Sequence, residues 1–198
     1  MVGPASPGPP PRLLSDDGAA LDLDVTRWWG AVSPGERHVL SWAGGPVLDV
    51  GCGPGRVTVH LARTGVPALG IDIAPEATRA VRKQGAAAVT CCVFDRVPAE
   101  GRWSSVVLFD GNVGIGGDPA RLLCRVGGLL DEGGRVIVEL AAPGTALRQF
   151  LLGLSGTTQW QPWAVVGVDA AVVLAARAGL RVQHIERVEK RWFAVFGR

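Results

Sequence analysis

The 198-residue chain contains no tyrosine and only two lysines, Lys83 and Lys190. It also lacks any run of Lys or Arg, and its formal net charge of +2 is close to neutral. Because a nucleic-acid-binding surface needs a strong positive field, this composition argues against a nucleic-acid partner and favours a small molecule. Arginine greatly outnumbers lysine, and Ala, Gly and Pro are abundant, a bias that suggests a GC-rich bacterial genome.

Sequence signals for membranes, secretion and metals are absent as well. No apolar run approaches the roughly 20 residues that span a bilayer, and residues 1–11 lack the charged start and apolar core of a signal peptide. We therefore expect a cytoplasmic protein with a disordered tail at 1–14. The four cysteines form no CxxC pair and no cluster at metal-ligand spacing, so we expect free thiols and no metal site.

The most informative stretch runs from residue 47 to residue 55 and has the sequence VLDVGCGPG. An apolar strand here enters a glycine-rich turn, where backbone without Cβ atoms can approach a ligand closely, and the next helix presents free N–H groups. A nucleotide-like ligand is therefore expected. Asp49 would repel the pyrophosphate of a dinucleotide, so it points to a cationic ligand such as S-adenosylmethionine (SAM).

A second acid follows a second apolar strand. Asp72 lies 21 residues after Gly51, close to the roughly 20-residue offset of the ribose-binding acid in a βαβ unit. Together, VLDVGCGPG and ALGIDIAPEA resemble motifs I and II of the class I SAM-dependent methyltransferases. The resemblance extends over most of the chain, from about Pro46 to the C-terminus.

Strands and helices alternate after residue 45, which predicts a parallel sheet covered on both faces. Residues 131–134 are expected to form a turn. The segments 182–188 and 192–196 are joined by too few residues for a parallel crossover, so they must be antiparallel. With the family resemblance, this implies a Rossmann-like, doubly wound α/β fold with a mostly parallel seven-stranded sheet and an antiparallel C-terminal hairpin. The other expected strands are 47–50, 67–72, 87–94, 105–109 and 135–140, and the expected helices are 56–63, 75–84, 118–130 and 169–178.

The length of the chain fits one domain. We assign residues 45–198 to a SAM-binding methyltransferase domain that contains an acceptor-side insertion at 141–168. Residues 15–44 are predicted to form a helical extension or lid.

Ligands of an open parallel sheet bind beyond the carboxyl ends of its strands. Asp49 would attract the SAM ammonium directly or through water, and Asp72 would accept hydrogen bonds from the ribose hydroxyls. Ile73 could pack on the adenine. The resemblance implies that Asp95 accepts from the adenine amino group, with Phe94 where the family often has glycine; the alternative is a solvated turn residue. The candidate cofactor-binding residues are Asp49, Gly51, Cys52, Gly53, Gly55, Asp72, Ile73, Phe94, Asp95 and Asp110.

The segment 110–118, DGNVGIGGD, follows the fourth strand, where donor and acceptor should meet, and its glycines allow close backbone approach. Asn112 could position an acceptor heteroatom or the SAM amino group; the alternative is a left-handed turn residue. If a hydroxyl acceptor requires a base, His38, Glu139 and His184 are the available groups. A surface or satisfied histidine is the commoner outcome for His38, and a structural role is expected for His184 in the terminal hairpin. Asn112, Glu139 and His38 are the catalytic candidates.

Tryptophan is over-used in the two segments where class I methyltransferases commonly build a lid. The resemblance therefore implies an aromatic acceptor pocket, in which an arginine could recognise an acidic acceptor. The alternative is that large aromatics only dock the added segments onto the core and that the arginine makes a surface pair. The candidate acceptor-binding residues are Arg27, Trp28, Trp29, Trp160 and Trp163.

These observations predict a SAM-dependent methyltransferase that acts on a small-molecule acceptor, releases S-adenosylhomocysteine and is a monomer or homodimer. Three alternatives stay open. The same cofactor cradle could serve other SAM chemistry such as cyclisation, or a non-catalytic SAM-binding module. An NAD-dependent oxidoreductase is disfavoured by Asp49 and by the C-terminal hairpin.

Overall fold

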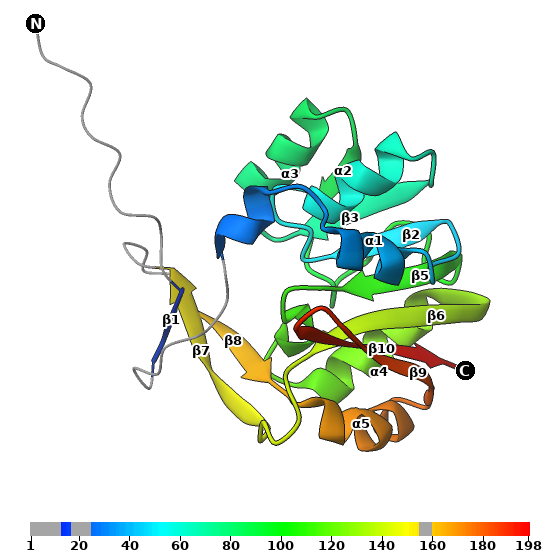
Figure 1. Ribbon diagram of the computed structural model, residues 1–198. Coiled ribbons are helices and arrows are strands. Elements are labelled where there is room, and N and C mark those ends of the chain that lie inside the picture. The colour runs from blue at the N-terminus through cyan, green and yellow to red at the C-terminus, as the bar shows by residue number, and fades with distance from the viewer. Residues whose placement is uncertain (1–12, 17–24, 155–159) are drawn as a thin grey trace, which may run out of the picture.

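The computed structural model describes residues 13–16, 25–154 and 160–198, so the predicted disordered tail at 1–14 lies almost wholly outside the described residues. A seven-stranded sheet in the order β4-β3-β2-β5-β6-β10-β9 forms the body of the molecule, and a three-stranded sheet in the order β1-β7-β8 lies beside it (Figure 1). The strands are β1 (Leu13–Ser15), β2 (Val47–Val50), β3 (Ala68–Asp72), β4 (Ala87–Thr90), β5 (Trp103–Leu108), β6 (Leu130–Leu140), β7 (Arg148–Leu154), β8 (Trp160–Val165), β9 (Arg181–Val188) and β10 (Arg191–Gly197).

The large sheet confirms the predicted fold. Strands β2 to β6 pair in parallel, whereas β10 pairs antiparallel with both β6 and β9. In the centre of the sheet, Asp49 is in register with Gly70 of β3 and Val107 of β5. The carboxyl ends of these strands therefore lie along one edge, which is where an open α/β sheet binds its ligand.

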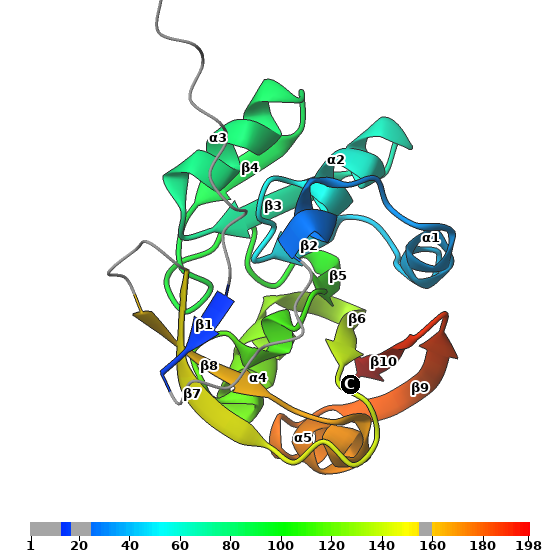
Figure 2. The same ribbon diagram turned by 60° about the vertical axis from the view of Figure 1, so that its left-hand side comes forward.

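Helices cover both faces of this sheet (Figure 2). Successive strand residues point to opposite faces, so Leu48 and Val50 pack with α4 and α5, while Val47 packs with α1 and α2. Asp49 shares the face of Val47, so its side chain points toward α2. The helices are η1 (Val25–Trp29), α1 (Pro34–Leu40), α2 (Arg56–Arg63), α3 (Pro75–Lys83), η2 (Asn112–Gly114), α4 (Pro119–Leu129), η3 (Val168–Ala170) and α5 (Ala171–Arg177).

The start of α4 follows from its capping residues. Asp118 accepts a hydrogen bond from the backbone N–H of Arg121, and Pro119 occupies the first helical position, which are the positions that these two residue types favour.

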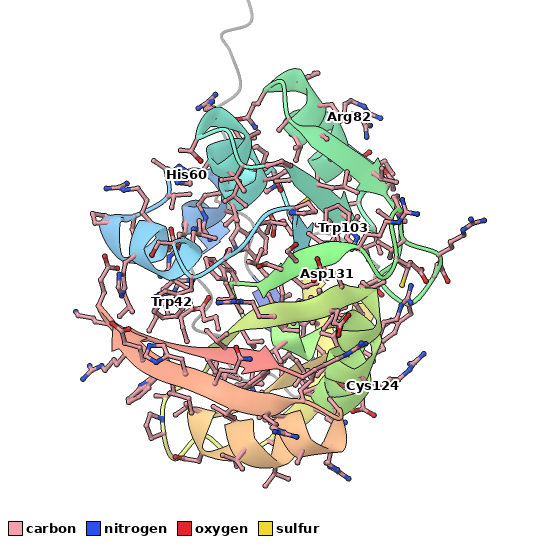
Figure 3. All side chains as sticks on the ribbon, turned by 90° about the vertical axis from the view of Figure 1, so that its right-hand side faces the viewer. Trp42, His60, Arg82, Trp103, Cys124 and Asp131 are labelled. Carbon is pink, nitrogen blue, oxygen red and sulfur yellow. The ribbon has the colours of Figure 1, made fainter. Side chains whose placement is uncertain are left out.

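The predicted turn at 131–134 is wrong, because β6 begins directly after α4. Trp103 pairs with residue 130, and the register then shifts, so the acidic and glycine residues form an irregular start of the strand. Figure 3 shows Trp103 and Asp131 on these two neighbouring strands.

The three-stranded sheet, which we call the lid sheet, combines two segments that are distant in sequence. Strands β7 and β8 lie within the predicted insertion, and β1 adds to β7 with Leu14 opposite Gly153. Figures 1 and 2 both place this sheet beside the body, with β8 leading toward α5. Among the described residues, no helix is long and apolar enough to cross a membrane.

Candidate cofactor and acceptor site

The glycine turn between β2 and α2 is held from two sides. Gly51 has φ +71°, and its carbonyl oxygen and that of Val50 both accept hydrogen bonds from Asn112 Nδ2 at 2.9 Å. On the other side, the N–H of Gly53 donates to Asp72 Oδ2 at 2.9 Å. Gly53 also has a positive φ, of +52°, and a Cβ placed there would have no atom within 4 Å. The turn is therefore rigidly supported while the space above Gly53 is open.

Other parts of the turn face the protein interior. A Cβ on Gly55, which is the N-cap of α2 with φ +99°, would come within 2.6 Å of the Val81 side chain. Cys52 is buried, with its Sγ close to Gly70, and burial raises the pKa of its thiol. Cys52 and Gly55 are therefore packed against the protein interior. Gly53 is the part of the turn that a ligand can approach.

Asp49 is 3% exposed and does not face the open space. Its Oδ2 accepts hydrogen bonds from the hydroxyl of Thr58 at 2.6 Å and from the N–H of Thr58 at 3.1 Å. Burial raises the pKa of Asp49 to about 6, against the lowering effects of Thr58 and Arg56. The carboxylate thus satisfies an N–H group in the first turn of α2, which otherwise has no side-chain cap at its N-terminus.

Asp72 and the residue after it lie at the carboxyl end of β3. One carboxylate oxygen of Asp72 accepts from Gly53, and the other accepts from the N–H of Ala74 at 2.9 Å. Ile73 is 54% exposed, which is unusual for so large an apolar side chain. Both residues therefore lie at the carboxyl edge of the sheet, and Asp72 also contacts the glycine turn.

Phe94 and Asp95 lie after β4. The carboxylate of Asp95 is exposed and has no hydrogen bond within the described part of the chain, while its carbonyl oxygen accepts from Arg125. The ring of Phe94 is stacked under the guanidinium of Arg121, with 4.2 Å from Cζ to the ring centroid, and lies against Gly116. Asp95 is thus free to accept from a ligand.

A cluster of five buried or half-buried charges lies at the carboxyl edge of the sheet. Arg56 forms ion pairs with Glu36 and Asp110, and its side chain is only 3% exposed. Arg191 contacts Glu36 as well, meets Asp110 at 3.2 Å, and binds both carboxylate oxygens of Glu139. Four members come from regular elements, namely Glu36 from α1, Arg56 from α2, Glu139 from β6 and Arg191 from β10, and Asp110 lies in the turn after β5.

The electrostatics of this charge cluster follow from burial and pairing. Burial raises the pKa of Asp110, and the nearby arginines only partly offset it. Burial also acts to raise the pKa of Glu36, but the Ser33 N–H and the two arginines outweigh it and lower the value. Burial acts to lower the pKa of Arg56 and of Arg191, but the carboxylates outweigh it and raise both. The two guanidiniums therefore stay charged between three carboxylates.

The three catalytic candidates are all engaged with the protein. Asn112 binds the glycine turn, and Glu139 is held by Arg191 and by the N–H of Asp110. His38 lies on the exposed side of α1, where its Nε2 is 3.2 Å from Glu186. The structure brings Asn112 together with the glycine turn and Glu139 with the charge cluster, but it does not bring His38 to either.

The glycines after β5 accommodate the lid sheet. A Cβ on Gly114 would collide with the carbonyl oxygen of Ala164 in β8, and one on Gly117 would lie 3.2 Å from Pro162. Among these glycines, Gly116 has the ring of Phe94 as its neighbour. The segment that comes close to Gly114 and Gly117 is thus strand β8 of the protein itself.

The candidate acceptor residues are spread around this region. Arg27 Nη1 lies 3.9 Å from Asp110 at the edge of the charge cluster. Trp29 is 74% exposed, and Trp28 precedes it in η1. In β8, Trp160 lies over Gly153 within the lid sheet, and Trp163 packs beside Gly114 with its Nε1 buried and, within the described residues, without a hydrogen-bond partner.

Sequence reasoning missed three members of the charge cluster: Glu36, Arg56 and Arg191. Glu36 carried a local signal, because Ser33 and Glu36 have the spacing of a capping box, and the structure contains both of its hydrogen bonds. Arg56 directly follows the glycine turn and Arg191 begins the last strand. Arg56 pairs with Asp110 at a separation of 54 positions and Arg191 with Glu36 at a separation of 155, so neither pairing has a local sequence signal.

The residues at the glycine turn fit a nucleoside-bearing cofactor. Space is open over Gly53, the Asp72 carboxylate binds the Gly53 N–H, and the exposed Ile73 follows Asp72 in the chain. Across the three described ranges of the chain, no group of three or more His, Cys, Asp and Glu side chains could hold a metal ion.

Comparison with known proteins places this geometry in context. Residues 47–134 match the family described as "Methyltransferase domain". The ubiquinone biosynthesis O-methyltransferase of Xanthomonas oryzae pv. oryzae is 38% identical over 74 residues, which cover 31% of this chain and 31% of that protein. The chain thus spans about a third of the length of the curated relatives that it matches.

Two solved structures share the fold over most of the chain. A SAM-dependent methyltransferase from Bacteroides fragilis, in complex with S-adenosylhomocysteine, has a TM-score of 0.76 at 19% identity, covering 94% of this chain and 86% of that one. The 1,6-didemethyltoxoflavin-N1-methyltransferase of Burkholderia thailandensis has a TM-score of 0.66 at 19% identity, covering 88% and 81%.

Proposed function

We propose that this chain is a class I methyltransferase that transfers the methyl group of SAM to a small molecule and releases S-adenosylhomocysteine, because residues 47–134 match the methyltransferase-domain family and the fold is shared with a SAM-dependent methyltransferase. The observation that carries this proposal is the glycine turn, which Asp72 and Asn112 hold in place while the space over Gly53 stays open. A turn of this kind lets a ligand approach the backbone closely.

The cofactor would lie along the carboxyl edge of β2, β3 and β4. The open backbone at Gly53 would line its methionine part, and Asp72 would accept from its ribose hydroxyls. Ile73 would cover one face of the adenine, and Asp95 would accept from the adenine amino group. Asp49 would act indirectly, because its carboxylate is turned inward to Thr58 and so holds the start of α2 under the turn.

Bound SAM supplies an electrophilic methyl group on a sulfonium, so the protein's task is to align an acceptor atom with it. Glu139 is occupied by Arg191, and His38 by Glu186. Neither is positioned as a free base in this arrangement. We therefore infer that the acceptor atom is nucleophilic as bound, and that the loop containing Asn112 and Asp110 positions it.

Three observations support a small-molecule acceptor. The chain is nearly neutral, with a net charge of +2, which disfavours nucleic acid. The lid sheet adds a wall beside the carboxyl edge of the large sheet. The Burkholderia thailandensis protein, whose fold this chain shares, methylates a small molecule by its name.

The proposal is tested by incubating the protein with SAM and a panel of amines, phenols, thiols and carboxylic acids. We expect S-adenosylhomocysteine to form together with one acceptor whose mass rises by a methyl group. Conversion of SAM without S-adenosylhomocysteine would instead assign another SAM reaction. Binding of NAD but not of SAM would overturn the proposal.

A matched pair of glycine variants locates the site. Gly53 and Gly85 both have positive φ, +52° and +82°, and a Cβ added to either would have no atom within 4 Å, so Ala should strain the backbone similarly at both. We expect Gly53→Ala to weaken SAM binding and Gly85→Ala to leave it unchanged. Equal effects of the two variants would remove Gly53 from the cofactor site.

A further inference from the structure

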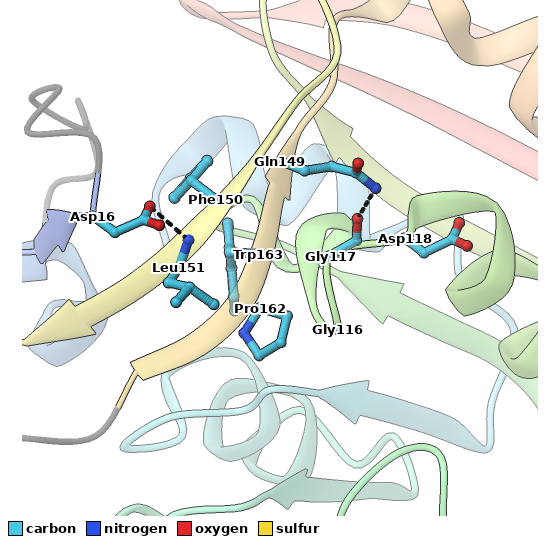
Figure 4. A pocket seen from close by; sticks show the side chains of 9 residues that line it. All are labelled: Asp16, Gly116, Gly117, Asp118, Gln149, Phe150, Leu151, Pro162 and Trp163. Atoms are coloured by element: carbon cyan, nitrogen blue, oxygen red, sulfur yellow. Dashed lines mark hydrogen bonds between the residues drawn. The ribbon is translucent and has the colours of Figure 1, made fainter.

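A pocket of about 400 Å³ lies between the lid sheet and the loop that leads into α4. This volume is within the range of small-molecule sites. In Figure 4, Asp16 and Asp118 stand on opposite sides of the pocket, with Trp163 and Pro162 between them. The remaining lining residues are Gly116, Gly117, Gln149, Phe150 and Leu151.

The polar side chains of this pocket offer acceptor atoms. Asp16 Oδ1 accepts from the N–H of Leu151 at 2.9 Å, and Asp118 Oδ1 accepts from the N–H of Arg121 at 3.0 Å. Each contact holds its carboxylate in place and leaves the second oxygen for a ligand. Gln149 donates through Nε2 to the carbonyl oxygen of Gly117 at 2.6 Å, which leaves its Oε1 as a further acceptor.

No arginine, lysine or histidine is among the described residues that line the pocket. Two guanidiniums nearby are stacked on rings: Arg148 lies over Phe150, at 4.7 Å from the centroid, and Arg121 lies over Phe94. The described lining therefore carries two carboxylates and no cation of its own.

The other walls are apolar. Phe150 is 8% exposed and packs in the lid sheet opposite Trp163, while Leu151 is 41% exposed and lies opposite Pro162. An indole ring favours a flat apolar partner and also attracts cations to its face. A ligand that carries both a ring and a positive charge would match the carboxylates and these walls together.

The pocket is separated from the cofactor edge by a single loop. Gly116 lines the pocket and also contacts the ring of Phe94, which belongs to the predicted adenine side. The same loop begins at Asn112, which binds the glycine turn. A molecule in the pocket is therefore next to the segment that the proposed function assigns to the positioning of the acceptor.

We propose that this pocket binds the acceptor through a protonated amine attached to an aromatic or other ring. That the bound molecule is the methyl acceptor rests on the proposed function. The preference of the pocket for a protonated amine does not. Asp16 and Asp118 supply the negative charge, and Trp163 supplies the ring contact.

Three compounds of similar size test the charge preference: 2-phenylethylamine, 2-phenylethanol and 3-phenylpropionate. Binding is followed by NMR titration of ¹⁵N-labelled protein, using the indole signal that disappears in Trp163→Phe. We expect the amine to bind about fivefold more tightly than the alcohol, the upper range for one partly exposed ion pair, and the carboxylate to bind most weakly. Equal affinities, or tighter binding of the carboxylate, would overturn the proposal.

Charge-neutral variants assign the preference to the pocket. Asn keeps an oxygen that can accept from the N–H of Leu151 at position 16 and from the N–H of Arg121 at position 118, so Asp16→Asn and Asp118→Asn, singly and together, remove charge with little structural change. We expect the preference for the amine to vanish in the double variant and to remain in Asp131→Asn, whose carboxylate binds Ser104 at the other end of the sheet. Gln149→Lys adds a positive charge to the pocket lining without altering either aspartate, so it should abolish the preference for the amine as well.

The two proposals fail in different ways. The titrations are made without cofactor, and SAM binding is measured separately on the same samples. If SAM binds and a methylated product forms but the double variant keeps the amine preference, this inference is wrong and the proposed function stands. If the amine preference depends on both aspartates but SAM does not bind, the pocket assignment stands and the proposed function fails.

Discussion

Removing Arg56 should destabilise the protein strongly, because its side chain is 3% exposed and lies between two carboxylates. In Arg56→Met, Glu36, Asp110 and Glu139 would share Arg191 as their cation within the cluster. Loss of one partner from a buried ion pair costs about 3 to 5 kcal/mol. We expect a loss of this size in the free energy of unfolding, measured by urea denaturation at neutral pH.

The structure also defines variants that separate charge balance from packing. The double variant Glu36→Gln with Arg56→Met removes one charge of each sign, so we expect it to be more stable than Arg56→Met alone by roughly 1 to 2 kcal/mol. Arg56→Lys keeps the charge but lacks the fork that reaches both carboxylates, so its loss should be intermediate. Glu100→Gln, in the exposed pair with Arg125, serves as the control and should change stability little.

Two results would refute this reasoning about the charge cluster. One is a loss below about 1 kcal/mol in Arg56→Met, which is the range of exposed ion pairs. The other is a double variant that is no more stable than the single variant, since that would mean that Glu36 and Arg56 are not energetically coupled.

Three further outcomes follow from single side chains. Burial raises the pKa of Asp49 to about 6 from its ordinary 3.8, so between these two pH values the folded state holds a proton on Asp49 that the unfolded state has lost. The free energy of unfolding should therefore fall by about 3 kcal/mol as pH rises from 3.8 to about 6. Urea denaturation at several pH values should show a smaller fall in Asp49→Asn, and parallel profiles of the two proteins would contradict this assignment. Gly114→Ala should lower the melting temperature and detach β8, because its Cβ would meet Ala164; an unchanged melting temperature would contradict this packing. Asn112→Ala removes two hydrogen bonds to the glycine turn and should weaken SAM binding measured by calorimetry by about 1 to 3 kcal/mol; wild-type affinity would show that the turn does not depend on Asn112.

The order of the strands in the large sheet and of the helices between them could be predicted because these elements carry local signals. These signals act within a few residues. They include the apolar strand that contains Asp49, the helix start at Asp118 and Pro119, and the short link before Arg191. The direction of the Asp49 side chain was harder, although strand alternation with Val47 indicates it once the faces of the sheet are known. Its carboxylate was predicted to attract the SAM ammonium directly or through water, and in the structure it binds the first turn of α2.

The charge cluster and the lid sheet could not be predicted, because both depend on contacts between distant segments. Glu36 and Arg191 are separated by 155 positions, and β1 pairs with β7 at a similar range. Each charged residue alone is typical of a protein surface. The glycines at 114 and 117 were recognised as unusual, but the sequence did not indicate that the partner approaching them is the backbone of β8.

The central claim is that SAM binds at the glycine turn with Asp72 beside it. Calorimetric titration of SAM into the wild-type protein and into Asp72→Ala tests this most directly, with Glu76→Ala in the exposed first turn of α3 as the control. We expect Asp72→Ala to weaken binding by about 1 to 3 kcal/mol and Glu76→Ala to have no effect. Unchanged affinity in Asp72→Ala, or wild-type binding of NAD but not SAM, would contradict the account.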